Sequence, residues 1–373
     1  MSGGVDSSVA AALLVEQGLE VVGIMLRLWS EGETPTVGDG RQVSLRSNRC
    51  CTPEDTTLAR RVADQLGIPF YLVNVADSFK RLVVQDFIAQ YSAGQTPNPC
   101  LNCNRHVRFE VLLNKALGLG AEKLATGHYA RVRPPRGNKG EAESKFQLLR
   151  AVDHNKDQSY VLSVLNQDKL RHVMFPLGEL IKPQVREIAA RKGLPVADKA
   201  DSQDLCFVAD GDYRGFLARN APDALRPGPI RDTAGRVVGQ HHGLALYTIG
   251  QRKGIGISGP EALYVIALQA AENAVIVGAL SELGRNECLA LRVNYVSGEI
   301  PSAPFRATAK IRYKAHEAAC AITPLPHSAA HVHFDQAQRD ITPGQAIVFY
   351  DQQVVIGGGI ISTDEGRRRI QDE

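Results

Sequence analysis

Blocks of apolar residues along the first half of the chain alternate between a strand pattern and a helix pattern. Val9 to Val15 is an apolar run typical of a helix, and Gly18 is a suitable residue to end it. Val21 to Trp29 is almost continuously apolar, as expected for a parallel strand covered on both faces. A strand over 69–75 and a helix over 79–91 continue the series. The alternation predicts an α/β fold with a doubly wound parallel sheet.

The pattern changes in the second half. Residues 209–281 are rich in Gly and Pro and hold only short apolar runs, whereas residues 282–373 hold short alternating runs at regular spacing. Evenly spaced short strands of this kind are typical of a small β-barrel or a β-sandwich. We therefore predict an α/β domain over 1–208, a small central domain over 209–281 and a C-terminal β-barrel domain over 282–373.

The composition of the chain limits the classes of protein to which it can belong. With 373 residues, 44% of them hydrophobic and 22% charged, the chain has the composition of a globular protein of two or three domains. It has no run of about 18 apolar residues and no signal-peptide pattern, which predicts a cytoplasmic protein without a membrane partner. A net charge of +3 neither indicates nor excludes a nucleic-acid partner. Seven cysteines without an export signal favour chemistry or metal binding over a disulfide framework.

The first eight residues, MSGGVDSS, form the most informative stretch. Gly3 and Gly4 lack a Cβ, so the backbone can turn tightly and bring its N–H groups against an anion. Ser7 and Ser8 add hydroxyls at the start of a helix whose positive end faces the same point. Asp6 is a candidate ligand for the Mg²⁺ that accompanies phosphates. The alternative is an ordinary helix start with serine caps and a glycine turn.

This loop is not a Walker loop, because the glycine spacing differs and no Lys follows the second glycine. It resembles the SGGxDS loop of ATP pyrophosphatases, which cleave ATP between the α and β phosphates. Such a loop normally follows a buried strand, whereas this sequence begins at the loop itself. We therefore expect that the first strand of the sheet is missing from the sequence as it stands.

The segment TPNPCLNCN places Cys100 and Cys103 in a Cys-x-x-Cys pair. Cys103 is expected at the start of an amphipathic helix that runs to Leu117, where the helix dipole would lower the pKa of its thiol. The pair fits half of a zinc site, a thioredoxin-type redox pair, or a nucleophile with a neighbour. A second Cys-x-x-Cys motif is absent from the sequence, and the flanking residues lack the thioredoxin pattern.

A third cysteine, Cys206 in DSQDLCF, is flanked by acidic and polar residues. If Cys206 and Cys103 met at one site, sulfur could arrive as a persulfide on one and leave by disulfide formation with the other. Cys288 and Cys320 lie in β-rich segments and are expected to be buried structural residues. Cys50 and Cys51 receive no catalytic role.

Six segments occur in one order along nearly the whole chain: SGGVDSS, TPNPCLNCN, TGHYAR, HNKDQSY, DSQDLCF and HHGLALYTIGQRKGIGI. Together they resemble the tRNA-specific 2-thiouridylases (the MnmA/TrmU family). The resemblance implies an ATP pyrophosphatase (PP-loop) catalytic domain related to the adenine nucleotide α-hydrolases, followed by a tRNA-binding central domain. It implies ATP-dependent 2-thiolation of the wobble uridine of tRNA through an adenylated intermediate and a cysteine persulfide. A sulfur-carrier or cysteine desulfurase relay protein would supply the sulfur.

The resemblance also implies roles for individual residues. Cys103 would be the nucleophile, and Cys206 would carry the persulfide and form a transient disulfide with Cys103. The ATP site would comprise Met1, Ser2, Gly3, Gly4, Val5, Asp6, Ser7, Leu26 and Gly127. The target base would contact Asn98, Pro99 and Cys100. The tRNA would contact His128, Lys156, Asp157, Gln158, Arg312, Tyr313 and Gln345.

Several alternatives stay open. Some relatives have an Asp where this chain has Cys100, so Cys100 need not act as an acid or base. Cys100, Cys103 and Cys206 together could hold an iron–sulfur cluster with one open iron. The chain could also be a lysidine synthetase or an amide-forming synthetase of the same superfamily, or a metal-stabilised RNA-binding module. Basic residues expected to hold the tRNA backbone, each alternatively a solvated surface charge, are Arg252, Lys253, Lys310, Arg312 and Lys314.

Overall fold

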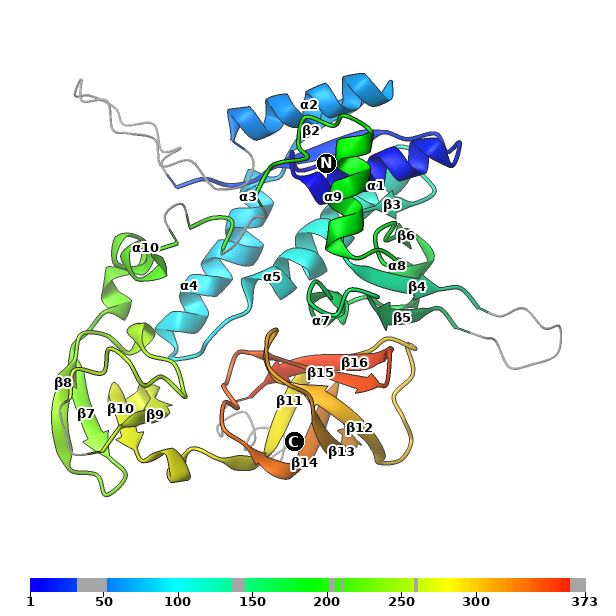
Figure 1. Cartoon of the computed structure of the whole chain (residues 1–373). Coiled ribbons are helices and arrows are strands. Elements are labelled where there is room, and N and C mark those ends of the chain that lie inside the picture. Colours follow the sequence, from blue (N-terminus) through cyan, green and yellow to red (C-terminus); the bar gives the residue numbers. More distant parts are fainter. Residues whose placement is uncertain (32–51, 136–144, 201–204, 209–210, 258–260, 363–373) are drawn as a thin grey trace, which may run out of the picture. The chain divides into compact units, whose positions relative to one another are not determined.

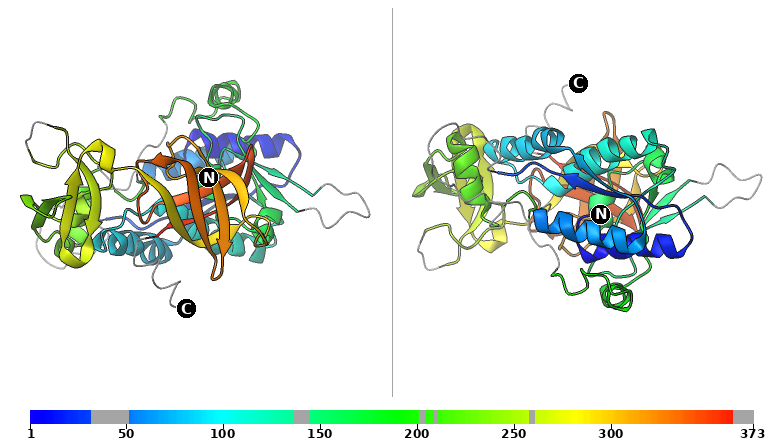
Figure 2. Two further views of the ribbon diagram at one scale, coloured as in Figure 1. Left: turned by 90° about the horizontal axis from the view of Figure 1, so that it is seen from below. Right: turned by 90° about the horizontal axis from the view of Figure 1, so that it is seen from above.

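A computed structural model describes residues 1–31, 52–135, 145–200, 205–208, 211–257 and 261–362, drawn as ribbons in Figure 1 and Figure 2. The chain divides into two compact units. The first unit comprises Met1–Val84 and Asn102–Asp212, and the second comprises Gln85–Leu101 and Tyr213–Glu373. In the part of the chain that the structure describes, no helix is long and apolar enough to cross a membrane.

The first unit opens with helix α1 (Val5–Glu16), strand β1 (Gly23–Arg27), helix α2 (Pro53–Leu66) and strand β2 (Phe70–Asn74). β1 pairs with β2 in parallel. α2 begins with a capping box, in which the Asp55 N–H donates to Thr52 Oγ1 at 3.1 Å and the Thr52 N–H donates to Asp55 Oδ2 at 3.2 Å. It ends at Gly67, whose left-handed φ of 68° suits glycine.

Helix and parallel strand continue to alternate. β3 (Leu124–Ala125) pairs in parallel with β6 (Val173–Met174), while β4 (Ala130–Arg133) and β5 (Gln147–Arg150) form an antiparallel hairpin. The helices around them are α7 (Ser159–Leu162), α8 (Gln167–Arg171) and α9 (Lys182–Arg191). The predicted α/β character is therefore confirmed, with the described parallel strands arranged as the pairs β1–β2 and β3–β6.

Two helical stretches run from one unit into the other along the chain. The first consists of α3 (Ala76–Phe79), η1 (Lys80–Val84) and α4 (Gln85–Ser92). The second consists of α5 (Pro99–Asn102), the π-helix η2 (Cys103–Leu112) and α6 (Leu113–Gly118). The expectation that this second helix starts at Cys103 is wrong. The helix begins one turn earlier, because Pro99 has the φ of a first helical residue and Asn98 Oδ1 accepts the Leu101 N–H at 3.1 Å.

Apolar packing of α1 against α9 forms a core of the first unit. Val5 and Val9 of α1 meet Val185 and Ile188 of α9, and all four side chains are buried. Removing this apolar surface from water contributes roughly 25 cal/mol per Å². The packing fixes the start of α9 beside the start of α1.

The second unit contains helix α10 (Tyr213–Asn220) and a four-stranded sheet of order β8-β7-β10-β9. Its strands are β7 (Gly228–Asp232), β8 (Val237–His241), β9 (Tyr264–Gln269) and β10 (Ala274–Gly278). β7 and β10 are parallel, and the other pairs are antiparallel. Short 3₁₀ turns lie at η3 (Pro222–Ala224), η4 (Leu244–Leu246), η5 (Ala270–Glu272) and η6 (Leu280–Glu282).

The predicted barrel is present as a closed ring of antiparallel strands (Figure 1; Figure 2, left). The order is β11-β14-β13-β12-β15-β16, and β16 also pairs with β11. The strands are β11 (Arg285–Tyr295), β12 (Phe305–Lys310), β13 (Ala318–Leu325), β14 (Ala329–Gln338), β15 (Ala346–Asp351) and β16 (Val354–Ile361). Cys288 and Cys320 lie in its core, where burial raises the pKa of their thiols to about 12 and about 11.

The segment before α5 is anchored on the loop between β14 and β15. The Thr96 N–H donates to the Pro343 carbonyl at 2.9 Å. Gly344, which follows Pro343, has a φ of +90°. A Cβ at this position would lie 2.9 Å from the carbonyl oxygen of Thr96 and 3.0 Å from the backbone nitrogen of Thr96. This close approach requires glycine, so the backbone of the barrel loop sets the position of the chain that leads into Asn98 and Cys100.

We expect Gly344→Ala to destabilise the protein by about 2–4 kcal/mol, because the variant would suffer both left-handed strain and a clash with Thr96. Gly235→Ala is the matched control, since Gly235 has φ +83° with nothing within 4 Å of its Cβ position. In the control variant only the left-handed strain should lower the free energy of unfolding, by about 1 kcal/mol. Denaturant unfolding of both variants checks this, and equal losses would contradict the contact with Thr96.

Candidate active site

The loop from Met1 to Ser8 is closed by its own hydroxyl groups. The Ser2 N–H donates to Ser7 Oγ at 3.0 Å, and the Ser7 and Ser8 hydroxyls donate to the Gly4 carbonyl at 3.2 and 2.9 Å. Gly4 is the N-cap of α1 and no side chain caps this helix start. The Met1 nitrogen hydrogen-bonds to the carbonyl of Ile24 in β1, the strand that also holds Leu26. The loop thus presents the N-terminal end of a 12-residue helix, a place that favours an anion.

Two glycines bring other backbone segments against the loop. A Cβ on Gly3, which has φ +68°, would lie 2.5 Å from the carbonyl oxygen of Asp55 in α2. A Cβ on Gly127, just after β3, would lie 2.8 Å from the Ser7 nitrogen and from the Asp6 carbonyl carbon. The loop is therefore held between the first turn of α2 and the chain that leaves β3. Gly127 belongs to the predicted ATP site, and the structure brings it to the loop.

Two lysines that the sequence analysis missed converge on this loop. Lys182 Nζ donates to both carboxylate oxygens of Asp6, at 2.7 and 2.9 Å, and Tyr129 donates its hydroxyl to Asp6 Oδ1 at 2.7 Å. Lys199 Nζ donates to the Gly3 carbonyl at 2.9 Å and also pairs with Asp55. Lys182 is only 8% exposed, and Asp6 provides the counter-charge beside its buried ammonium.

The backbone of Lys182 is fixed as firmly as its ammonium. Its N–H donates to Asp153 Oδ2 at 2.8 Å, and Asp153 Oδ1 accepts the Asn155 N–H at 3.0 Å. Nothing in the sequence near Lys182 marks it as a functional residue, apart from its place before the Pro that starts α9. A helix end, two ammonium groups and one carboxylate at a glycine-walled loop can bind a polyphosphate.

The segments that carry the two candidate sulfur residues of the first unit both contact α3. Cys103 is half-buried and begins η2, and η2 contacts α3. Cys206 is half-buried in a turn, and the next residue, Phe207, packs edge-to-face on Phe79 of α3 with ring centroids 6.0 Å apart. Both phenylalanine rings are buried. The structure therefore brings two segments about a hundred residues apart in sequence to the same helix.

The predicted target-base residues belong to the second unit, with the predicted tRNA contacts of the barrel. Asn98 uses its side chain to cap α5, Pro99 is buried and Cys100 is exposed. Arg312 Nη2 donates to Thr342 Oγ1 at 2.6 Å and to the Ile249 carbonyl at 3.0 Å. The Gln345 N–H donates to the Thr342 carbonyl, and Tyr313 is 38% exposed.

The predicted tRNA contacts of the first unit are largely occupied by internal bonds. Asp157 is buried and accepts the Ala151 N–H at 3.0 Å and the Ser159 hydroxyl at 2.8 Å. Gln158 Oε1 accepts the Tyr129 N–H at 3.0 Å, while Lys156 is half-buried. These bonds shape the turn that leads into α7.

His128 follows Gly127 and lies in an aromatic cluster. Its ring centroid is 5.9 Å from that of Phe109 and 6.0 Å from that of Phe175. Burial, assisted by the positive charge of Arg108, lowers the pKa of His128 to about 3. The imidazole is therefore neutral near neutral pH, and Thr126 Oγ1 hydrogen-bonds to its Nδ1 at 2.7 Å.

A metal centre was the other interpretation of the cysteines. Within the described ranges no three His, Cys, Asp or Glu side chains gather as metal ligands would. Cys100, Cys103 and Cys206 all lie within those ranges, whereas Cys50 and Cys51 lie outside them.

The chain matches three family models in succession. They are described as a tRNA methyl transferase HUP domain over residues 1–210, a tRNA methyl transferase PRC-barrel domain over 214–279, and an aminomethyltransferase beta-barrel domain over 285–361. The first of these covers more than half of the chain.

Curated relatives carry a different name from these models. The tRNA-specific 2-thiouridylase MnmA of Roseiflexus castenholzii is 50% identical, covering 98% of this chain and 98% of that protein. Those of Magnetococcus marinus and Moorella thermoacetica are 49% and 50% identical, covering 97% of this chain and 97% and 98% of theirs.

We expect the stability that neutral His128 contributes to be lost as pH falls from about 6.5 towards about 3, because the unfolded state binds the proton first. The difference in unfolding free energy between wild type and His128→Gln should shrink by up to about 1.4 kcal/mol per pH unit in this window. Denaturant titrations at about pH 7.5, 6 and 5 measure it. His154→Gln, at an exposed loop position, is the control, and a pH-independent difference for His128→Gln would contradict the assignment.

Proposed function

The chain belongs to the family of MnmA tRNA-specific 2-thiouridylases, and we propose that it catalyses ATP-dependent 2-thiolation of the wobble uridine, position 34, of tRNA. The observation that carries the proposal is identity of 50% over 98% of both chains with a protein of that name. The loop with Asp6, Lys182 and Lys199 supports it, because 2-thiolation at the expense of ATP needs a site that holds released pyrophosphate.

The first step activates a poor electrophile. The C2 oxygen of uridine attacks the α-phosphorus of ATP, a new O–P bond forms, and the bond from that phosphorus to the bridging oxygen breaks. Pyrophosphate leaves with the electron pair and remains at the loop, where the backbone N–H groups at the start of α1 and the Lys182 ammonium neutralise its charge. Gly127 and the backbone of Leu26 line the nucleotide.

We propose that Mg²⁺ accompanies the phosphates and that Asp6 is its protein ligand. Both oxygens of Asp6 are partnered by Lys182, but its side chain remains 35% exposed and carboxylate oxygen suits this hard cation. The ion would supply charge neutralisation at the phosphates. In its absence Lys182 holds the carboxylate at the loop.

In the second step the terminal sulfur of a Cys206 persulfide attacks C2, a C–S bond forms, and the C–O bond breaks with AMP as the leaving group. The Cys103 thiolate then attacks the Cys206 sulfur, which releases the sulfur on the base and leaves a Cys103–Cys206 disulfide. Two thiols are thereby oxidised while the transferred sulfur is reduced, and an external thiol restores them. The packing of both segments beside α3 supports this pairing.

The remaining assignments follow the same proposal. Asn98, Pro99 and Cys100 hold the unstacked base, and the tRNA contacts are His128, Lys156, Asp157, Gln158, Arg312, Tyr313 and Gln345. A sulfur-carrier or desulfurase relay protein supplies the persulfide in the cytoplasm. The domains run over 1–208, 209–281 and 282–373, which the stretches matched by the family models support. A cluster held by Cys100, Cys103 and Cys206 is the alternative.

The decisive test incubates the protein anaerobically with unmodified tRNA, ATP, Mg²⁺ and a low-molecular-weight persulfide, which transfers its outer sulfur to Cys206, and measures 2-thiouridine and iron. We expect thiolation by iron-free protein, reduced at least about 10³-fold in both Cys103→Ala and Cys206→Ala. Cys288→Ala, in the barrel core, is the control and should thiolate like wild type.

Thiolation that tracks iron and also needs Cys100 would move the chemistry to a cluster. Activity that survives both cysteine variants would indicate another synthetase of the superfamily. No AMP formation with bound tRNA would favour an RNA-binding module and overturn the proposal.

We expect Lys182→Met to lower tRNA-dependent AMP formation by about 10²-fold or more, because it removes the buried ammonium at the loop. Lys192→Met is the matched control: Lys192 caps the other end of α9, and its ammonium pairs with Glu16 at 3.1 Å. Release of labelled AMP from ATP measures both. Equal rates in the two variants would show that Lys182 serves only the fold.

A further inference from the structure

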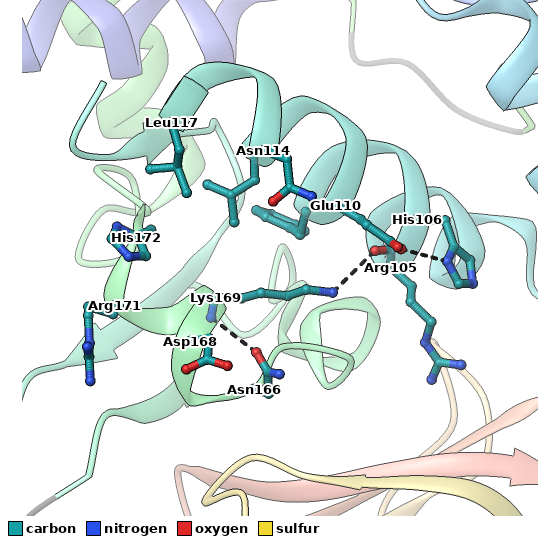
Figure 3. A pocket seen from close by; sticks show the side chains of 12 residues that line it. Arg105, His106, Glu110, Asn114, Leu117, Asn166, Asp168, Lys169, Arg171 and His172 are labelled. Carbon is teal, nitrogen blue, oxygen red and sulfur yellow. Dashed lines mark hydrogen bonds and ion pairs between the residues drawn. The ribbon is translucent and has the colours of Figure 1, made fainter. Parts of the chain in front are cut away.

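A charged groove lies alongside η2 and α6, the helical stretch that contains Cys103. It encloses about 650 Å³ and is lined on one side by η2 and α6 and on the other by α8 with its flanking residues (Figure 3). We call it the Arg105–His172 groove. Its wall includes the apolar side chains of Phe109, Leu113 and Leu117. The volume falls within the roughly 300–1,000 Å³ of ligand-sized pockets, and nothing in the proposed reaction uses it.

Cationic groups lie along this groove. In Figure 3 the Lys169 ammonium reaches across its middle, with Arg105 towards one end and Arg171 towards the other. Two carboxylates also line it, and one of them, Glu110, is partnered by His106 at 2.9 Å. The other is Asp168. The cations therefore outnumber the carboxylates, and one carboxylate is already engaged.

The Lys169 ammonium is incompletely compensated. Burial lowers its pKa and the charge of Arg105 lowers it further, while Glu110 acts in the opposite direction. The hydrogen bond that its ammonium donates to the Arg105 carbonyl is long, at 3.5 Å. An anion in the groove would provide the missing counter-charge.

Arg171 offers a free guanidinium on a fixed backbone. Its carbonyl accepts a hydrogen bond from Lys123 Nζ at 2.8 Å, and the neighbouring His172 ring bonds to the Glu122 carbonyl at 3.1 Å. Within the described residues the Arg171 guanidinium itself has no hydrogen-bond or ion-pair partner. The residue is exposed, so its guanidinium donors are open to solvent at the end of the groove away from Arg105.

We propose that the Arg105–His172 groove binds the phosphate–ribose backbone of the tRNA beside the target uridine. The inference rests on the proposed function, in which a polyanionic strand must pass Cys103, two residues before Arg105 on the same helix. Guanidinium and ammonium groups hold phosphate oxygens, and the apolar wall suits ribose. Side-chain contacts of this kind position the strand without reading its sequence.

The test measures binding of an unmodified tRNA transcript at several salt concentrations. Arg171→Gln should weaken binding about three- to tenfold near 0.1 M salt. It should also make the plot of the logarithm of the association constant against the logarithm of the salt concentration less steep, by about 1 in slope. Lys115→Gln is the matched control, because Lys115 is exposed on α6, carries the same charge and lies outside the groove lining. Thermal unfolding confirms that each variant is folded.

Asp168→Asn provides a test of opposite sign. Removing this carboxylate should strengthen tRNA binding and raise the salt slope, whereas a merely structural effect would weaken binding in both variants. Binding and slope of Arg171→Gln equal to those of Lys115→Gln would overturn the proposal.

Two further outcomes separate this inference from the function on which it rests. If wild type makes no 2-thiouridine, the proposed function fails, whatever the binding data show. If Arg171→Gln binds tRNA normally but loses thiolation only with a protein sulfur donor, and not with the low-molecular-weight persulfide, then the groove receives a protein and the RNA proposal is wrong.

Discussion

The ion pair between Asp6 and Lys182 is the interaction on which the candidate site depends. Taking an ammonium out of water is costly unless an anion accompanies it, so a lysine that is 8% exposed requires Asp6. The pair joins the first turn of α1 to the first residue of α9, and the apolar packing of the two helices holds it there. A phosphate at the loop therefore meets a positive charge that the fold has already positioned and partly dehydrated, which is the condition for strong electrostatic stabilisation.

The second constraint is the close approach of one backbone segment to another. It occurs at the first loop and at the segment that contains Thr96. Gly3 and Gly127 let α2 and the end of β3 touch the loop, and Gly344 lets the barrel touch Thr96. In each case a Cβ would fall within 3 Å of a backbone atom. The segment that carries the candidate base-binding residues is thus positioned by the barrel in its own compact unit, although it lies within the α/β half of the sequence. The barrel therefore sets the position of the segment that holds Asn98, Pro99 and Cys100.

Much of the architecture could be predicted because it depends on local pattern. The apolar run at 21–29 became β1, the alternating runs after 282 became the barrel, and Gly3 of the first loop has the positive φ that a tight turn needs. The error at Cys103 was also local, because the helix starts one turn earlier at Pro99 with Asn98 as its cap. His128 was expected at the RNA, yet its contacts with Phe109 and Phe175 come from segments that no local pattern connects to it.

The sequence by itself determined the α/β class of the first domain, the C-terminal barrel, the glycine turn that opens the first helix and the candidate sulfur residues. These depend on backbone permissiveness, periodicity and reactive side chains, which are properties of short segments. Only the tertiary structure decided which distant residues complete the site. Lys182 lies 176 positions from Asp6, and Lys169 lies 64 from Arg105. Packing of helices brings such residues together, and a lysine has no sequence signature that separates a buried counter-ion from a solvated surface charge.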